Sequence, residues 1–325
     1  MIVQSILDLI GNTPMVRVNR LHKNTNLELY VKLEKFNIGG SVKDRIAKYM
    51  IEQAEKTGQL NKNKTVIEAT SGNTGIGLAM VCRVKGYDLF LVMPENMTLE
   101  RRQILNAIGA KIILSEAGKG MDGAEDLARN IASQSPDKYF MPNQFASQAN
   151  VLAHYETTAE EILRDTNGKV THFVAGIGTT GTLMGVSKRL KEHNPDIQII
   201  AVEPEKGTTI QGLKNLETQY VPAIWKKSQV DEIHKVHPKK AEEAARLLAL
   251  QEGIFVGPSS GAIFHTALKK ADEIKGVMVA IAPDGGEKYL STTLCDPTLC
   301  LKCARKYGIR CSYIDGSPIS KAPSK

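Results

Sequence analysis

The fold of this chain is decided by one stretch, Asn37-Ile38-Gly39-Gly40-Ser41-Val42-Lys43-Asp44-Arg45. Its glycine-rich turn runs directly into apolar residues at helical spacing, which predicts a helix over residues 42–57 with Lys43 in the first turn. A cation is disfavoured there because the N-terminus of a helix carries positive dipole charge. Lys43 is therefore either a solvated surface lysine or an amine held partly neutral, the form that a Schiff-base lysine needs.

A second glycine-rich turn, Gly176-Ile177-Gly178-Thr179-Thr180-Gly181-Thr182, follows an apolar run and opens another predicted helix. A strand, a glycine turn and a helix N-terminus together form a cradle of backbone N–H groups that suits a phosphate. The glycines at 176, 178 and 181 also fit the spacing of a dinucleotide site. The acidic residue that such a site needs would be Glu203, which follows the next predicted strand.

Composition limits the classes of protein to consider. With 325 residues, 42% of them hydrophobic and 24% charged, the chain has the make-up of a globular protein with room for two domains. The formal charge of +7 is spread along the sequence, so we expect no nucleic-acid partner. No apolar run is long enough to span a membrane, and the first ten residues do not form a secretory signal. We expect a cytoplasmic protein with reduced thiols.

Strand and helix patterns alternate along the chain, and several predicted strands, such as 90–92 and 279–281, are apolar at every position. Strands of that kind belong to parallel sheets covered on both faces. We therefore predict an α/β fold of two open, mainly parallel twisted sheets flanked by helices.

Five motifs occur in an order that resembles the cysteine synthases, which belong to the fold type II pyridoxal-phosphate enzymes. They are the Lys43 stretch, Glu68-Ala-Thr-Ser-Gly-Asn-Thr-Gly75, Gly178-Thr-Thr-Gly-Thr182, Gly257-Pro-Ser-Ser-Gly261 and Lys288-Tyr-Leu-Ser-Thr292. The third motif, and the segment Ile210-Gln-Gly-Leu-Lys-Asn-Leu-Glu217, resemble the B type of cysteine synthase more than the A type.

The resemblance implies the tryptophan synthase β-like fold, with the cofactor in a cleft between two domains. A smaller domain, residues 40–148, would be inserted into a larger one made of residues 1–39 and 149–293. Residues 294–325 would form a tail. The relatives are homodimers, so a homodimer is expected here.

By the same resemblance, Lys43 is the catalytic residue that binds pyridoxal 5'-phosphate as a Schiff base and then serves as the base at the substrate Cα. The expected phosphate loop consists of Gly178, Thr179, Thr180, Gly181 and Thr182. The expected substrate-carboxylate residues are Thr70, Ser71, Gly72, Asn73, Thr74 and Gln144, with Asn73 also reaching the cofactor. Read without the resemblance, the 70–74 turn is an ordinary helix-capping turn.

Ser259 matches the residue that faces the pyridine nitrogen of the cofactor, with Ser260 as the rival. A neutral hydroxyl would leave that nitrogen less protonated than a carboxylate would. Ser259 is also a candidate N-cap for the helix expected from Gly261. Lys214 is a cation where the A type has none, so it would suit a substrate phosphate, or it is a solvated loop lysine.

The tail contains four of the five cysteines, Cys295, Cys300, Cys303 and Cys311. The first three have the spacing of plant-type iron–sulfur ligands, and zinc is the other ion that four thiolates suit. A reduced tail or a redox disulfide is the alternative. None of the histidines has the spacing of metal ligands, and each is expected on the surface or in the core.

These observations predict a β-replacement enzyme that makes L-cysteine from O-acetyl-L-serine or O-phospho-L-serine and sulfide. The alternative is the same machinery used as a cysteine or serine β-lyase, or with another thiol or amine as nucleophile, as in a cystathionine synthase. A more distant alternative is a non-catalytic metal or redox sensor, which would not need both Lys43 and the glycine cradle.

Overall fold

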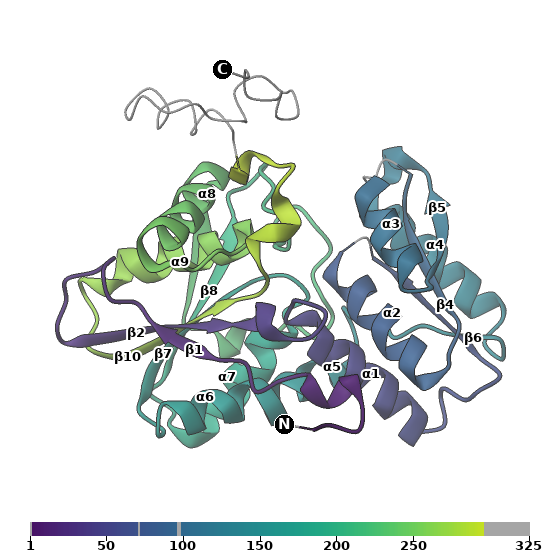
Figure 1. The fold of residues 1–325 in the computed structure, drawn as a ribbon, viewed down its shortest axis with the longest axis horizontal. Helices are drawn as coiled ribbons and strands as arrows, with labels where there is room; N and C mark the ends of the chain where they lie inside the picture. Colours follow the sequence, from purple (N-terminus) through teal and green to yellow (C-terminus); the bar gives the residue numbers. More distant parts are fainter. Residues whose placement is uncertain (1, 71, 96–98, 296–325) are drawn as a thin grey trace, which may run out of the picture.

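The computed structural model describes residues 2–70, 72–95 and 99–295, and it contains two separate sheets (Figure 1). Within this part of the chain the larger sheet has six strands in the order β1-β2-β10-β7-β8-β9. All neighbouring strands are parallel except β1 and β2. The strands are β1 (Met15–Arg17), β2 (Leu27–Leu33), β7 (Val170–Gly176), β8 (Gln198–Pro204), β9 (Glu232–Val236) and β10 (Gly276–Ala282).

The smaller sheet, as far as the structure describes it, has four parallel strands in the order β5-β4-β3-β6. These are β3 (Thr65–Ala69), β4 (Leu89–Pro94), β5 (Lys111–Ser115) and β6 (Tyr139–Phe140). The predicted α/β fold of two mainly parallel sheets flanked by helices is confirmed.

The described α-helices lie on the faces of the two sheets (Figure 1). They are α1 (Lys43–Lys56), α2 (Asn73–Lys85), α3 (Leu99–Ala107), α4 (Gly120–Gln134), α5 (Gln148–Ala153), α6 (Ala159–Asp165), α7 (Gly181–His193), α8 (Pro238–Leu247) and α9 (Pro258–Ala271). Short 3-10 helices occupy Ile6–Leu9, Glu34–Phe36, Ala117–Lys119, Lys227–Gln229, Gly286–Tyr289 and Thr293–Cys295. No described helix has both the length and the apolar character needed to cross a membrane.

Hydrophobic periodicity predicts one continuous helix over residues 150–164 and another over residues 239–251, and the structure differs in both places. In the first, α5 and α6 are joined by a π-helical segment, His154–Thr158. In the second, α8 is followed directly by a π-helical segment, Leu248–Glu252. Hydrophobic periodicity indicates that a helix is present but does not reveal one widened turn within it.

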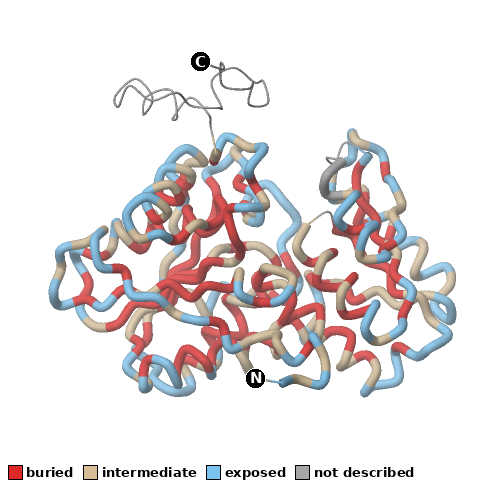
Figure 2. The backbone as a smooth tube through the Cα atoms, in the orientation of Figure 1, coloured by how far each residue is buried: buried red, intermediate tan, exposed pale blue. Residues whose placement is uncertain are grey.

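The core lies on both faces of each sheet, where the buried backbone is concentrated (Figure 2). Strand β10 shows why its sequence is apolar at every position. Met278 and Ala280 pack into one hydrophobic cluster, whereas Val279 and Ile281 pack into another on the opposite face. Successive side chains of a strand point to opposite faces, so a sheet covered by helices on both sides needs apolar residues throughout.

A cluster of buried charges joins the start of α1 to the rest of the larger body. Arg45 donates to Glu34 from Nε at 2.7 Å and to Glu161 from Nη1 at 2.6 Å. Lys32 contacts Glu161 at 2.8 Å. Arg45, Lys32 and Glu34 are 1% exposed or less. The cluster therefore links β2, α1 and α6 through charges that have little access to water.

Replacing Arg45 with methionine should lower the free energy of unfolding by about 3–5 kcal/mol, because two buried carboxylates lose their shared cation. The Arg45 guanidinium helps hold the pKa of Glu161 down to about 2, from 4.5. A depressed carboxyl pKa stabilises the fold above the unfolded pKa, and this contribution is lost as pH falls from about 4.5 towards 2. The variant should therefore lose part of this acid dependence.

Urea unfolding at several pH values measures both effects. Arg164→Met is the matched control, since Arg164 pairs with Asp165 on the surface. It should cost less than about 1 kcal/mol. Equal losses for the two variants would contradict the role of the buried cluster.

Candidate active site

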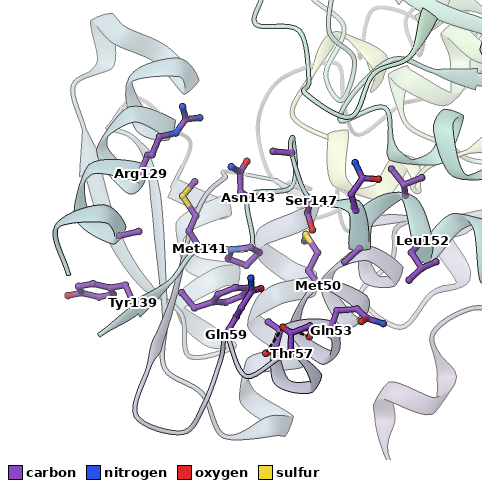
Figure 3. A pocket seen from close by; sticks show the side chains of 18 of the residues that line it. Met50, Gln53, Thr57, Gln59, Arg129, Tyr139, Met141, Asn143, Ser147 and Leu152 are labelled. Carbon is purple, nitrogen blue, oxygen red and sulfur yellow. Dashed lines mark hydrogen bonds between the residues drawn. The ribbon is translucent and has the colours of Figure 1, made fainter. Parts of the chain in front are cut away.

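A cavity of about 870 Å³ is lined by residues from the ends of strands in both sheets. Its walls include the starts of α1, α2 and α9, the turn between β7 and α7, and the segment that follows β10. Ligands of open α/β sheets bind at this end, outside the carboxyl ends of the strands. A second hollow, of about 980 Å³, runs past Met50, Met141 and Leu152 (Figure 3). That hollow contains none of the predicted site residues.

Lys43 is the first residue of α1 and lines the cavity. Its position is set by the backbone, since Val42 N–H donates to the Pro283 carbonyl at 2.8 Å. Burial lowers the pKa of the Lys43 amine, and the carboxylates of Asp284 and Glu34 oppose that shift. A solvated surface lysine is therefore the wrong interpretation.

Asn73, which lines the same cavity as Lys43, forms hydrogen bonds through both polar atoms of its side-chain amide. Its Nδ2 donates to Asp284 at 2.7 Å, and its Oδ1 accepts from Lys288 Nζ at 2.8 Å. The Lys288 amine also donates to the carbonyl groups of Gly39 and Gly40. These contacts connect α2 to the turn that precedes Lys43. Sequence reasoning assigned no role to Asp284, or to Lys288 beyond its place in a motif.

The 70–74 turn connects β3 to α2. The N-cap of α2 is Gly72, so the helix is not capped by a side chain. Thr74 Oγ1 donates to Gln144 Oε1 at 2.6 Å, which brings together two of the predicted substrate residues. Thr70, Gly72, Asn73, Thr74 and Gln144 all line the cavity. Ser71 lies outside the described residues.

The glycine turn after β7 forms a cradle at the N-terminus of α7, over residues 176–182. Thr180 adopts a left-handed conformation with φ of 69° and has a buried Oγ1 without a hydrogen-bond partner among the described residues. A Cβ on Gly178 would lie 2.9 Å from the Gly212 carbonyl oxygen, so only glycine fits there. A strained threonine with an unpaired hydroxyl at a helix N-terminus suits an anion that accepts hydrogen bonds.

The acidic residue of the dinucleotide alternative is used elsewhere. The Glu203 carboxylate accepts from Leu216 N–H at 3.0 Å and does not line the cavity. The cradle therefore lacks the ribose-binding carboxylate of a dinucleotide site.

Ser259 and Ser260 differ in where they lie. Ser259 lines the cavity, next to Gly212, whereas Ser260 does not line it. The suggestion that Ser259 is a helix N-cap is wrong, because Gly257 is the N-cap of α9 and no side chain caps this helix. Ser259 instead lies within the first turn, since α9 starts three residues earlier than predicted.

Lys214 lines the cavity opposite the loop that holds Gln144. Its Nζ lies 4.5 Å from the centroid of the Phe145 ring, a cation–π distance. The Lys214 amine thus lies over an aromatic face inside the cavity and does not extend into solvent as a plain loop lysine would.

Two further residues escaped sequence reasoning. His154, expected in the core or on the surface, is buried and contacts Thr182 of the cradle. Glu68, at the penultimate position of β3, is 1% exposed. Neither residue carries a spacing signal that marks it in a single sequence.

The predicted metal site falls largely outside the described residues, which include Cys295 but not Cys300, Cys303 or Cys311. Cys295 is partly buried against the larger core. Among the residues that the structure describes, no three histidine, cysteine or acidic side chains are grouped to hold a metal ion.

The sequence profile of the pyridoxal-phosphate dependent enzymes matches residues 6–284. The chain belongs to this family. It is 46% identical over 294 residues to cysteine synthase B of Pseudomonas aeruginosa, covering 90% of this chain and 98% of that protein. The recognised resemblance is thereby confirmed.

Two solved structures share the fold of this family member. The cysteine synthase of Entamoeba histolytica has a TM-score of 0.86 at 39% identity, covering 96% of this chain and 92% of that one. A hydrogen sulfide-producing enzyme of Fusobacterium nucleatum has a TM-score of 0.83 at 44% identity, covering 89% of this chain and 100% of that one.

The cavity fits the cofactor of this family. An anion cradle with an unpaired buried hydroxyl lies in the same cavity as a lysine with a lowered pKa. The cradle suits the phosphate of the cofactor. The lysine suits its carbonyl group, because an amine with a lowered pKa is partly neutral and can react with a carbonyl.

The Glu68 carboxyl should make stability depend on pH. Burial raises its pKa to about 8, the backbone N–H groups of Ala69, Gln144 and Asn143 act against the shift, and the Glu125 carboxylate adds to it. Its pKa is 4.5 in the unfolded chain, so the folded state binds the extra proton between these values. Stability therefore falls as pH rises from about 4.5 to 8. Glu68→Gln should remove that fall and gain roughly 2–4 kcal/mol at pH 8.

Urea unfolding of both proteins between pH 5 and 9 measures the difference. Glu116→Gln, an exposed carboxylate, is the control and should change stability equally at every pH. Parallel curves for Glu68→Gln and the unchanged protein would show that Glu68 ionises as an ordinary carboxyl.

Proposed function

We propose that this enzyme makes L-cysteine from O-acetyl-L-serine or O-phospho-L-serine and sulfide, with pyridoxal 5'-phosphate as cofactor. The observation that carries the proposal is the shared cavity of Lys43, the 176–182 cradle and the 70–74 turn. The cysteine synthases of Pseudomonas aeruginosa and Entamoeba histolytica, similar over nine-tenths or more of this chain, support the same reaction.

In this proposal the chain binds the cofactor through two regions. Lys43 holds it covalently, and its phosphate is bound by Gly178, Thr179, Thr180, Gly181 and Thr182. Ser259 offers a neutral hydroxyl to the ring nitrogen, and Asn73 binds near the ring. The bound cofactor supplies an electron sink for the charge that develops at the substrate Cα.

The remaining residues bind the substrate and move its proton. The turn of Thr70, Ser71, Gly72, Asn73 and Thr74 binds the substrate carboxylate, and Gln144 contacts it from the facing loop. The Lys43 amine, whose lowered pKa favours the neutral form, takes the proton from Cα. Loss of the ester group and addition of sulfide complete the replacement.

Sulfide release from cysteine is the alternative reaction on the same residues. The hydrogen sulfide-producing enzyme of Fusobacterium nucleatum is a structural relative with 44% sequence identity, against 46% for cysteine synthase B of Pseudomonas aeruginosa. Comparing cysteine formed from acetylserine with sulfide released from cysteine discriminates between the two. A non-catalytic sensor is disfavoured, because it would not require Lys43 and the cradle in one cavity.

The organisation of the protein is proposed along with its function. We infer a smaller domain of residues 40–148, a larger domain of residues 1–39 and 149–293, and a cytoplasmic homodimer. The four tail cysteines as ligands of one zinc ion or iron–sulfur cluster stay a prediction. Analysis of metal and acid-labile sulfide in the purified protein is the relevant measurement.

Lys43→Ala should abolish cysteine formation, lowering turnover by several orders of magnitude, because the covalent attachment and the base are lost together. The unchanged protein should be yellow, and borohydride should fix the cofactor permanently on Lys43, as seen by peptide mass spectrometry. A colourless protein that stays inactive with added cofactor would refute the enzyme assignment.

Lys214→Ala should discriminate between leaving groups. If the Lys214 amine binds a substrate phosphate, the variant should lose roughly 1.5–3 kcal/mol in kcat/KM for phosphoserine, the worth of a charge-assisted hydrogen bond. Activity with acetylserine should hardly change. Lys206→Ala, an exposed lysine outside the cavity, is the control. Equal effects of Lys214→Ala on both substrates would mean that Lys214 does not bind the substrate phosphate.

A further inference from the structure

The π-helical segment His154–Thr158 brings a histidine beneath the phosphate cradle. This segment packs so closely on α7 that a Cβ on Gly185 would lie 2.7 Å from the His154 Cβ. Widened turns of this kind are rare and often occur at functional sites. Here the turn places His154, which is 1% exposed, against the first turn of α7.

Both ring nitrogens of His154 contact a threonine hydroxyl. The Nδ1 atom lies 2.9 Å from Thr158 Oγ1, and the Nε2 atom lies 3.2 Å from Thr182 Oγ1. Thr182 lines the cavity, whereas Thr158 is fully buried. His154 thus connects a hydroxyl inside the protein to a hydroxyl of the cradle.

The imidazole of His154 is neutral at any working pH. Burial lowers its pKa to about 3, and the Arg45 cation adds to that shift, while Glu34 and Glu161 oppose it. A neutral imidazole has one nitrogen that donates and one that accepts. His154 therefore donates a hydrogen bond to one of the two threonine hydroxyls and accepts one from the other.

The surroundings of Thr158 show which ring nitrogen of His154 carries the proton. The only hydrogen-bond partner of the Thr158 hydroxyl among the described residues is His154 Nδ1. If Nδ1 carried the ring proton, the buried Thr158 hydroxyl would have no described acceptor, and an unsatisfied buried donor is costly. Thr158 therefore donates to Nδ1, and the ring proton lies on Nε2, which donates to Thr182 Oγ1.

We propose that His154 is a positioning residue of the cradle, whose Nε2–H tautomer makes the Thr182 hydroxyl a donor to a bound phosphate group. In the opposite tautomer, the Thr182 hydroxyl would donate its only hydrogen bond to His154 Nε2, and its oxygen lone pairs would face the anion. This inference rests on the proposed function only in taking the phosphate to be that of the cofactor.

The tautomer itself is measured in the cofactor-loaded protein labelled with ¹⁵N-histidine. Two-bond ¹H–¹⁵N correlation spectra should give His154 the pattern of a neutral ring protonated at Nε2, unchanged between pH 6 and 9. The signal is assigned by its loss in His154→Gln. A ring protonated at Nδ1, or one that titrates in this range, would overturn the proposal.

Binding tests the consequence. Pyridoxine 5'-phosphate carries the phosphate but cannot react with Lys43, so its Kd for cofactor-free protein isolates the cradle. His154→Leu and Thr158→Val should each weaken binding, the first by roughly tenfold, the worth of about one hydrogen bond. Thr182→Val should have at least as large an effect. His154→Gln, which can place an amide donor near Nε2, should recover part of the loss.

A double variant shows whether His154 acts through Thr182. His154→Leu combined with Thr182→Val should bind no more weakly than Thr182→Val alone. The matched control is His172→Leu, because His172 also contacts a threonine, Thr171, at 2.8 Å but lies outside the cavity. Its Kd should not change. Additive losses in the double variant would mean that His154 only supports the fold.

The two proposals fail in different ways. If the cavity binds no phosphate, the unchanged protein will not bind pyridoxine 5'-phosphate or pyridoxal phosphate, and the proposed function fails. If His154 has no part in the cradle, the unchanged protein will bind both, and the His154→Leu and Thr158→Val variants will bind them equally well.

Discussion

The arrangement of the cavity depends on one buried interaction, the Arg45 guanidinium held between the carboxylates of Glu34 and Glu161. The three residues come from α1, from the 3-10 helix after β2, and from α6. A buried charge that loses its partner is far more costly than an exposed one, so these elements stay together as a unit. Lys43 lies two residues before Arg45, at the first position of the same helix. The cluster therefore fixes where the Lys43 amine can reach, without touching it.

The same cluster determines which lysine is available for chemistry. Lys32 is paired with Glu161 at 2.8 Å, and Arg45 donates to both oxygen atoms of Glu34 and both of Glu161. Lys43 has no ion pair among the described residues, so burial dominates and lowers its pKa. A fold that buried Lys43 with a carboxylate of its own would keep the amine charged and unreactive. Because Lys32 and Arg45 pair with the carboxylates of Glu34 and Glu161, Lys43 is left without an ion pair in the described part of the chain.

Much of this could be read from the sequence, for reasons that differ between elements. The spacing of apolar residues and the positions of the glycines predict β7, the cradle turn and the start of α7 at Gly181, because neighbouring residues in the sequence determine all three. The pattern predicts a helix from Gly261, whereas α9 begins at Pro258, because proline suits the first position of a helix, and Ser259 is therefore inside it. The π-helical segment at His154 could not be predicted, since it comes from packing between α5, α6 and α7. Asp284 and Lys288 lie more than 200 residues from Asn73, and only the folded chain brings them to its amide.

The cavity is built from helix N-termini, and charged side chains such as Lys214, Lys288, Asp284 and Glu287 also line it. The first turns of α1, α2, α7 and α9 supply Lys43, Asn73, Thr182 and Ser259 to its wall. No arginine lines the cavity in the described part of the chain. Each helix N-terminus contributes about half a positive charge and unpaired N–H groups. Together they attract the phosphate and carboxylate of the proposed ligands, and they add to the burial that disfavours a charged Lys43. One arrangement of helix N-termini thus favours bound anions and disfavours the charged form of the Lys43 amine.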